Sequence, residues 1–177
     1  MKLFPLTLWH GTSAHLLPLI RDHGLGGRNV MADWRVMEFL EWAFPQVGVA
    51  EYDFHDPDYL DLLPIRAAVD GGAAGMNFEY GSVYVAGGYN RAAEYAQSAP
   101  ELISFVRILL DVAGRREKPA VSDGLASFPE LSKFLSREPR PIVLKLPPTP
   151  MALIRDERGG PLQMPEQILE ISANSPS

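Results

Sequence analysis

The stretch from Leu8 to Leu25 constrains the fold of this chain more than any other, because it predicts a short strand followed closely by a helix. Leu6, Leu8 and His10 recur at two-residue spacing and therefore lie on one side of the strand. Gly11 follows the histidine, and glycine has no Cβ to keep a flat ligand away from the backbone. The strand is therefore expected to end with an imidazole beside backbone that a ligand can approach closely.

The helix after this strand has a predicted beginning and end. Thr12 and Ser13 are residue types that cap a helix or turn the chain. Proline is tolerated in the first helical turn, so Pro18 places the start of the helix near Leu17. Gly24 is placed to end the helix in a left-handed conformation.

Composition excludes several classes of protein. The 177 residues contain no cysteine and carry a net charge of −6, and we expect one domain spanning residues 1–177. The lack of cysteine excludes disulfides and Cys-ligated zinc, and favours a reducing, cytoplasmic environment. No apolar run reaches the roughly 18 residues of a membrane span, and Pro5 interrupts the first one, so neither a span nor a signal peptide is expected. The acidic balance argues against a broad nucleic-acid surface.

Apolar periodicity predicts several helices in the first two thirds of the chain. After a loop from Gly26 to Ala32, a helix capped by Asp33 runs to about Phe44, before Pro45. The residues of its apolar face are Val36, Phe39, Leu40 and Ala43. Further helices are expected from Arg91 to Gln97, with Asn90 as cap, from Pro100 to about Ala113, and from Pro129 to Leu135. The core face of the second of these consists of Leu102, Phe105, Ile108 and Leu109. A charged loop is expected from Gly114 to Asp123.

The segment from Glu51 to Asp61 is acidic and contains His55. Carboxylates with one histidine could suggest a metal site, but the ligand spacing of known metal sites is missing, and no metal is predicted. The favoured interpretation is a solvated turn in which Asp56-Pro57 opens a helix that ends before Pro64. A second short helix is then expected from Pro64 to about Val69.

Short β-strands are predicted mainly at the two ends of the chain. Besides the first, the candidates are Gly81–Ala86, Pro141–Leu146, Met151–Ile154 and Pro165–Ile171. This distribution indicates an α+β fold rather than a regular βαβ repeat.

Two tyrosines, Tyr84 and Tyr95, are separated by a two-glycine turn, one on a predicted strand and the other on the following helix. This placement can bring two aromatic rings to face each other across a slot, and such a slot suits a flat heteroaromatic ligand. The alternative is that both rings are core residues.

The ordered set of Trp-His-Gly-Thr before a helix, Val-Tyr-Val-Ala, Tyr95 and a late glutamate resembles the diphtheria-toxin-like ADP-ribosyltransferases, the His-Tyr-Glu class that includes the poly(ADP-ribose) polymerases. The resemblance extends in order from Thr7 to about Ile171, except that residues 26–78 match nothing in the family. It implies a single-domain split β-sandwich with flanking helices, and NAD as co-substrate.

The resemblance also implies roles for individual residues. His10 would hydrogen-bond a ribose hydroxyl of NAD, and Gly11 would offer its N–H and C=O to the nicotinamide carboxamide, with Thr12 beside them. Tyr84 and Tyr95 would enclose the nicotinamide ring. The catalytic residues would be Glu166, His10 and Tyr84, with the Glu166 carboxylate stabilising the cation that forms as the glycosidic bond opens.

Two departures from the family pattern leave alternatives open. Ala92 and Ala93 stand where the family often has Ser or Thr, so a hydrogen bond to the carboxamide is lost or supplied elsewhere, with Ser82 as a candidate. Glu170 lies on the same side of the last predicted strand as Glu166. Glu166 is favoured because Ile168-Leu169 follows it as in the family, and a surface glutamate is the alternative.

Four functions follow for comparison. The first is a mono-ADP-ribosyltransferase, with the context of a bacterial toxin or defence effector and an antitoxin or immunity protein as partner. The second is a module that binds NAD or ADP-ribose without turnover, and the third is an NAD glycohydrolase. The acidic balance speaks against the fourth, an RNA 2′-phosphotransferase, and favours a protein acceptor over nucleic acid.

Overall fold

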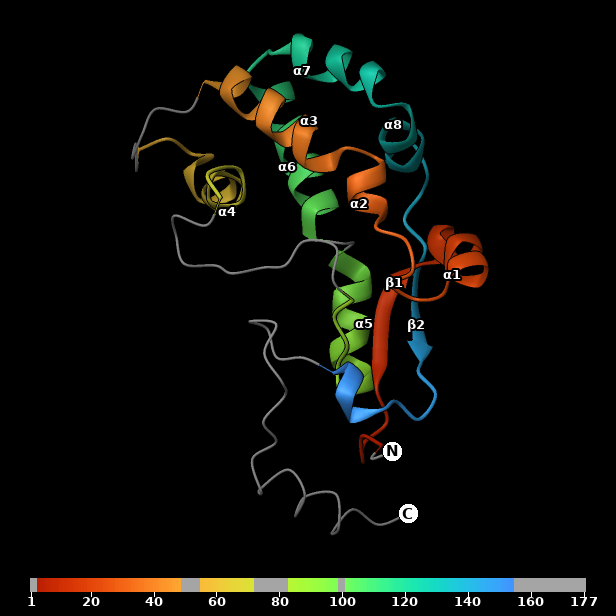
Figure 1. Ribbon diagram of the computed structural model, residues 1–177. Helices are drawn as coiled ribbons and strands as arrows, with labels where there is room; N and C mark the ends of the chain where they lie inside the picture. Colours follow the sequence, from red (N-terminus) through yellow and green to blue (C-terminus); the bar gives the residue numbers. More distant parts are fainter. Residues whose placement is uncertain (1–2, 49–54, 72–82, 99–100, 155–177) are drawn as a thin grey trace.

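The computed structural model describes residues 3–48, 55–71, 83–98 and 101–154, and Figure 1 shows their arrangement. The strands are β1 (Trp9–Ser13) and β2 (Pro141–Lys145). The helices are α1 (Leu17–His23), α2 (Val30–Asp33), α3 (Val36–Ala43), α4 (Tyr59–Val69), α5 (Tyr89–Ser98), α6 (Glu101–Arg115), α7 (Pro119–Gly124) and α8 (Pro129–Leu135), with 3-10 turns η1 (Ala14–Leu16), η2 (Phe44–Val47), η3 (Leu125–Ser127) and η4 (Met151–Leu153).

The sheet consists of two antiparallel strands from opposite ends of the chain. The β1–β2 register runs from Trp9 opposite Lys145 to Ser13 opposite Pro141. A single bridge, Trp9 to Ala86, attaches the segment before α5 to the other edge of β1. Mixed helix and strand confirm the α+β prediction, and within the described residues this sheet has no second sheet packed on it.

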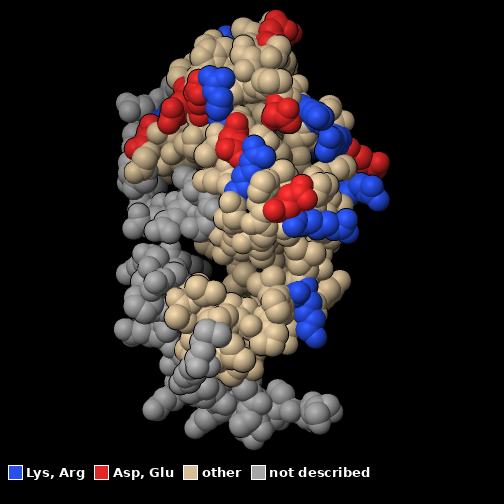
Figure 2. All heavy atoms as spheres, turned by 45° about the vertical axis from the view of Figure 1, so that its right-hand side comes forward, with Lys and Arg blue, Asp and Glu red and all other residues tan. Residues whose placement is uncertain are grey.

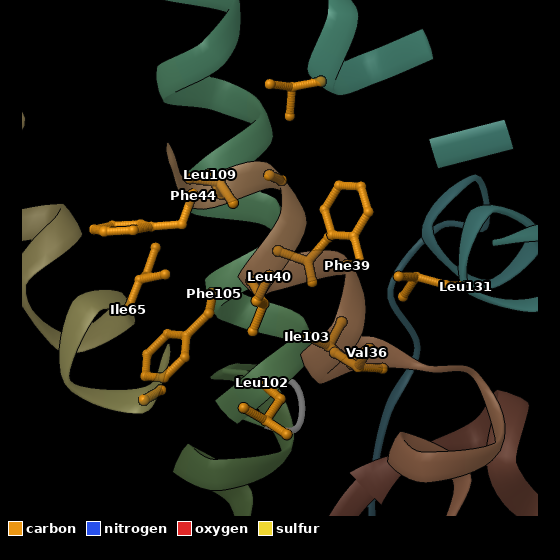
Figure 3. Close-up of a cluster of buried hydrophobic side chains, with 14 of the residues drawn as sticks. Val36, Phe39, Leu40, Phe44, Ile65, Leu102, Ile103, Phe105, Leu109 and Leu131 are labelled. Carbon is orange, nitrogen blue, oxygen red and sulfur yellow. The ribbon is translucent and has the colours of Figure 1, made fainter. Parts of the chain in front are cut away.

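The hydrophobic core lies between helices rather than on the sheet (Figure 1). All four residues predicted for the apolar face of α3 are fully buried, as predicted. They pack against α6, whose Leu102, Phe105 and Leu109 are buried, while Ile108 is half-buried. Figure 3 shows Ile65 of α4 and Leu131 of α8 closing this cluster from two sides.

Local signals placed several elements correctly. Helix α1 spans the predicted residues and ends at Gly24 with a φ of 80°, although its ψ of 164° lies outside the left-handed helical region. Helix α8 and strand β2 also begin where proline predicted them. The predicted helix after Pro100 is α6, which continues two residues beyond Ala113.

Other boundaries were wrong. The predicted loop up to Ala32 contains α2, which is capped by the Asn29 side chain, and Asp33 belongs to that helix instead of capping α3. The residue before α3 is Arg35, at a φ of 57°. Pro64 does not divide two helices, because α4 continues through it.

Four further predictions need correction. The charged loop at 114–123 contains α7, because Val121 is fully buried in the helical core. Where a strand was predicted at 151–154, residues 151–153 form the 3-10 turn η4. Of the strand predicted at 81–86, the described residues show only the Ala86 bridge, and Asn90 lies within α5 instead of capping it. The strand predicted at 165–171 lies outside the described residues.

The acidic segment is tied to α6 by ion pairs. Asp58 accepts hydrogen bonds from Arg115 (2.6 Å) and from Arg116 (2.9 Å), and Asp56 accepts one from Arg116 (2.5 Å). Arg116 also donates to the carbonyl of Val47 (3.1 Å), so it joins α4, α6 and η2. The predicted solvated turn is therefore a largely buried electrostatic contact between helices, and Asp56 forms an Asx turn with the Asp58 N–H (2.9 Å).

Candidate functional site

The two edges of strand β1 carry the peptide groups of different residues. The Leu146 N–H bonds the Leu8 carbonyl, and the Ala14 N–H bonds the Arg140 carbonyl, so even-numbered residues of β1 point their peptide groups at β2. Odd-numbered residues point theirs at the opposite edge, where the Trp9 N–H and C=O pair with Ala86 (2.8 Å each). The N–H and C=O of Gly11 therefore face the edge that carries the segment 83–86.

Continuing the Trp9–Ala86 pairing by two residues would place Tyr84 opposite Gly11. The ladder does not continue, since residues 83–85 are not paired as a strand. The Tyr84 carbonyl instead accepts a hydrogen bond from Nδ1 of His10 (2.8 Å). The segment thus separates from β1 at the point where Gly11 presents its peptide groups.

This contact fixes the tautomer of His10. A carbonyl oxygen only accepts, so Nδ1 carries the proton, and Nε2 of the neutral ring is left as an acceptor. Burial lowers the pKa of His10 from its usual 6.5, and the hydrogen bond to Tyr84 partly opposes this. At neutral pH the ring is therefore uncharged and suited to accept a hydrogen bond from a hydroxyl group.

Gly11 lies against helix α5 at very short range. A Cβ on Gly11 would lie 1.9 Å from the Ala92 carbonyl oxygen and 2.7 Å from the Ala96 nitrogen. The two alanines are buried in this contact. Close packing of β1 on α5 thus excludes a side chain at Gly11. This packing is a second reason for a glycine here, besides the close approach of a ligand that the sequence suggested.

The two tyrosines are at the surface rather than in the core. Tyr84 is 43% exposed and Tyr95 53% exposed. Tyr95 projects from α5, and the Arg91 guanidinium lies 5.0 Å from its ring centre. At the start of α5, the Tyr89 ring meets Trp9 of β1 edge-on at 5.3 Å, which holds helix and strand together.

Some of the remaining predicted site residues lie on β1 and α5, and others lie outside the described residues. Thr12 is buried within β1, and Ser13 caps η1 by accepting from the His15 N–H (3.3 Å). Ala93 is half-buried on α5. Ser82, Glu166 and the competing Glu170 lie outside the described residues. The structure therefore brings His10, Gly11 and the Tyr84 backbone together, and leaves the position of the predicted catalytic glutamate undescribed.

A hollow of about 120 Å³ near the end of β1 was not predicted from the sequence. It lies where the ends of β1, α5 and α8 meet the start of β2, and its lining includes His15, Arg107, Arg137 and Arg140. These residues are distant in sequence, so only the fold brings them together.

Two findings concern metals and membranes. Within residues 3–48, 55–71, 83–98 and 101–154, no three His, Asp or Glu side chains are grouped so as to hold a metal ion. The same residues include no helix with the length and apolar character needed to cross a bilayer.

No protein-family model matches the chain, and neither the comparison with curated proteins nor that with solved structures found a significant match.

Proposed function

We propose that this protein is an NAD-dependent mono-ADP-ribosyltransferase with the split β-sandwich fold of the diphtheria-toxin-like class. One observation carries the proposal: His10, fixed as an acceptor by the Tyr84 carbonyl, stands beside the outward-facing peptide groups of Gly11. A hydroxyl acceptor next to a backbone donor and acceptor is the set that a ribose and a carboxamide require. The exposed rings of Tyr84 and Tyr95 add two flat surfaces to this region.

In the proposed reaction the nicotinamide–ribose bond breaks, nicotinamide leaves, and ADP-ribose passes to a nucleophile on the acceptor. His10 Nε2 accepts from a ribose hydroxyl, and Gly11 holds the carboxamide. Glu166 accepts from the 2′-hydroxyl of the ribose and stabilises the cation that develops there. Because the Arg91 guanidinium already lies over the Tyr95 ring, a nicotinamide would stack on the other face of that ring.

The second candidate is a module that binds NAD without turnover, and Ala92 favours it. The family pattern places a hydroxyl near this helix position, whereas Ala92 is 1% exposed and packs on Gly11. A carboxamide bound at Gly11 would thus lack one hydrogen bond unless Ser82 supplies it. The proposed context is a toxin or effector acting in the cytoplasm, with a protein acceptor favoured by the net charge of −6 and an antitoxin or immunity protein as partner.

The test is incubation of the purified protein with labelled NAD and a cell lysate, following both free nicotinamide and macromolecule-bound label. Wild type is compared with Glu166→Gln, and Glu170→Gln serves as the matched control on the same predicted strand. The expected result is release and transfer by wild type and by the control, with both reduced at least about 100-fold in Glu166→Gln.

Each other outcome has a defined meaning. Loss in Glu170→Gln with retention in Glu166→Gln would reassign the catalytic glutamate. Release of nicotinamide without transferred label would make the protein a glycohydrolase. NAD binding without release would establish the binding module, and the absence of both binding and release would refute the proposal.

A further inference from the structure

The lining of the hollow at the end of the sheet includes three arginines. Arg107 comes from α6, Arg137 follows α8, and Arg140 immediately precedes β2. Among the described residues that line it, none is an aspartate or a glutamate. Within the described part of the chain, no ion pair joins any of these arginines to a carboxylate, whereas Arg28, Arg35, Arg91, Arg115 and Arg116 are all paired.

The positive charge of these arginines is opposite in sign to the net charge of the protein. The chain has a net charge of −6, and Figure 2 shows acidic and basic side chains interspersed over the helical upper part of the face in view. Three arginines around one small hollow bring like charges into the same region, and like charges repel each other. An arrangement of this kind is stabilised when an anion occupies the hollow.

The segment that carries two of the arginines is held in place by its backbone. The Ala14 N–H donates to the Arg140 carbonyl (2.7 Å), and His15 Nε2 donates to the Glu138 carbonyl (2.9 Å). The Arg137 N–H donates to the Phe134 carbonyl (3.2 Å), which continues the last turn of α8. Pro139 and Pro141, on either side of Arg140, fix φ at both positions. The loop is therefore preorganised, which lowers the entropy cost of binding a ligand.

The size of the hollow selects the ligand class. About 120 Å³ is several times the space that one water molecule needs, and it suits a group of a few heavy atoms rather than an extended polymer. Guanidinium groups bind phosphate oxygens bidentately, and the Ser13 hydroxyl is a further polar group in the lining. We propose that this hollow is a binding site for the phosphate group of a small phosphorylated ligand, separate from the proposed NAD site.

The site is independent of the proposed function, because it needs neither His10 nor Glu166. Its test is a titration of the intact protein, followed by amide NMR shifts, with inorganic phosphate and then with a phosphate monoester such as glycerol phosphate. Sodium chloride at matched ionic strength is the reference. Saturable shifts centred on residues 13–15 and 134–141 are expected with phosphate and absent with chloride.

The matched variants separate a built site from general charge attraction. Arg137→Gln/Arg140→Gln removes two charges from the exposed part of the lining, and Arg21→Gln/Lys133→Gln removes two exposed charges elsewhere. The first pair is expected to weaken phosphate binding about tenfold or more, and the second pair to change it less than about twofold. Thermal unfolding of each variant confirms that it is folded.

Three results would overturn the proposal. Equal weakening in both double variants would reduce the effect to net charge. Shifts that chloride reproduces would remove phosphate selectivity. A loss of NAD affinity in Arg137→Gln/Arg140→Gln that matches the loss of phosphate affinity would make the hollow part of the NAD site and not a separate one. Tighter binding of the monoester than of inorganic phosphate would identify the organic part as a further contributor, and equal binding would identify free phosphate as the ligand.

Discussion

Replacing Gly11 by alanine separates the two physical reasons for a glycine at this position. The added Cβ would lie 1.9 Å from the Ala92 carbonyl oxygen, whereas ordinary van der Waals contact begins near 3.4 Å. Strand and helix must therefore separate by about 1.5 Å, in a contact that also includes Ala96 and the Trp9–Tyr89 ring pair. Overpacking of this kind costs about 1–3 kcal/mol, and backbone on both sides places Gly11→Ala near the upper end.

For a chain of this length, about 3 kcal/mol corresponds to a fall in Tm of roughly 6–12 °C. The assay is thermal unfolding followed by circular dichroism, with NAD absent so that no ligand contributes. Gly87→Ala is the matched control, because a Cβ there meets no atom within 4 Å and the φ of Gly87 is not positive. Its effect is expected to stay below about 1 kcal/mol in either direction.

A Tm of Gly11→Ala within about 2 °C of wild type would refute the packing argument. If that variant also lost NAD binding, the glycine would be required for the ligand alone. If Tm fell as expected, NAD binding would be measured well below the new Tm, so that unfolding does not imitate a loss of affinity.

The remaining predictions concern protonation. His10 is expected to titrate with a midpoint below 6.5 in an NMR titration, because burial lowers its pKa. The stability that the neutral ring contributes is therefore present above pH 6.5 and is lost as pH falls. A midpoint at or above 6.5 would contradict the assigned environment of His10. The pKa of Asp58 is held below its usual 3.8 chiefly by the hydrogen bond from Arg115, and then by that from Arg116. The contribution of Asp58 to stability is therefore present above pH 3.8 and is lost as pH falls through the lowered pKa. Asp58→Asn should therefore lower Tm at pH 7 and flatten the dependence of Tm on pH below 4, and parallel curves for variant and wild type would contradict the role of this ion pair.

Much of the local structure was predictable because it depends on residues near one another in sequence. Proline fixes φ by itself and glycine permits a positive φ, so Pro18, Gly24 and Pro129 marked the ends of α1 and the start of α8 correctly. The three- and four-residue spacing of apolar residues identified the buried face of α3, because a helix repeats its faces at that spacing.

The failures have a common cause in tertiary packing. Pro64 was expected to end a helix, yet Leu62 and Ile65 on either side of it are buried, and their burial holds α4 together through the proline. The segment 114–123 looked like a loop because of its charges. Within this segment, Val121 is the one buried residue, and it anchors α7 to the core.

The sequence by itself was enough to propose residues for the candidate site, since a histidine and a glycine at a strand end and two tyrosines around a glycine turn are short-range patterns. It could not determine what those residues contact. The hydrogen bond from His10 to Tyr84 spans 74 positions, and that from His15 to Glu138 spans 123. The tautomer of His10, the separation of the segment 83–85 from β1, the close approach of Gly11 to α5 and the gathering of Arg107, Arg137 and Arg140 all depend on such pairings. Only the tertiary structure decided them, because backbone and side-chain groups distant in the chain choose partners through the packing of whole helices and strands.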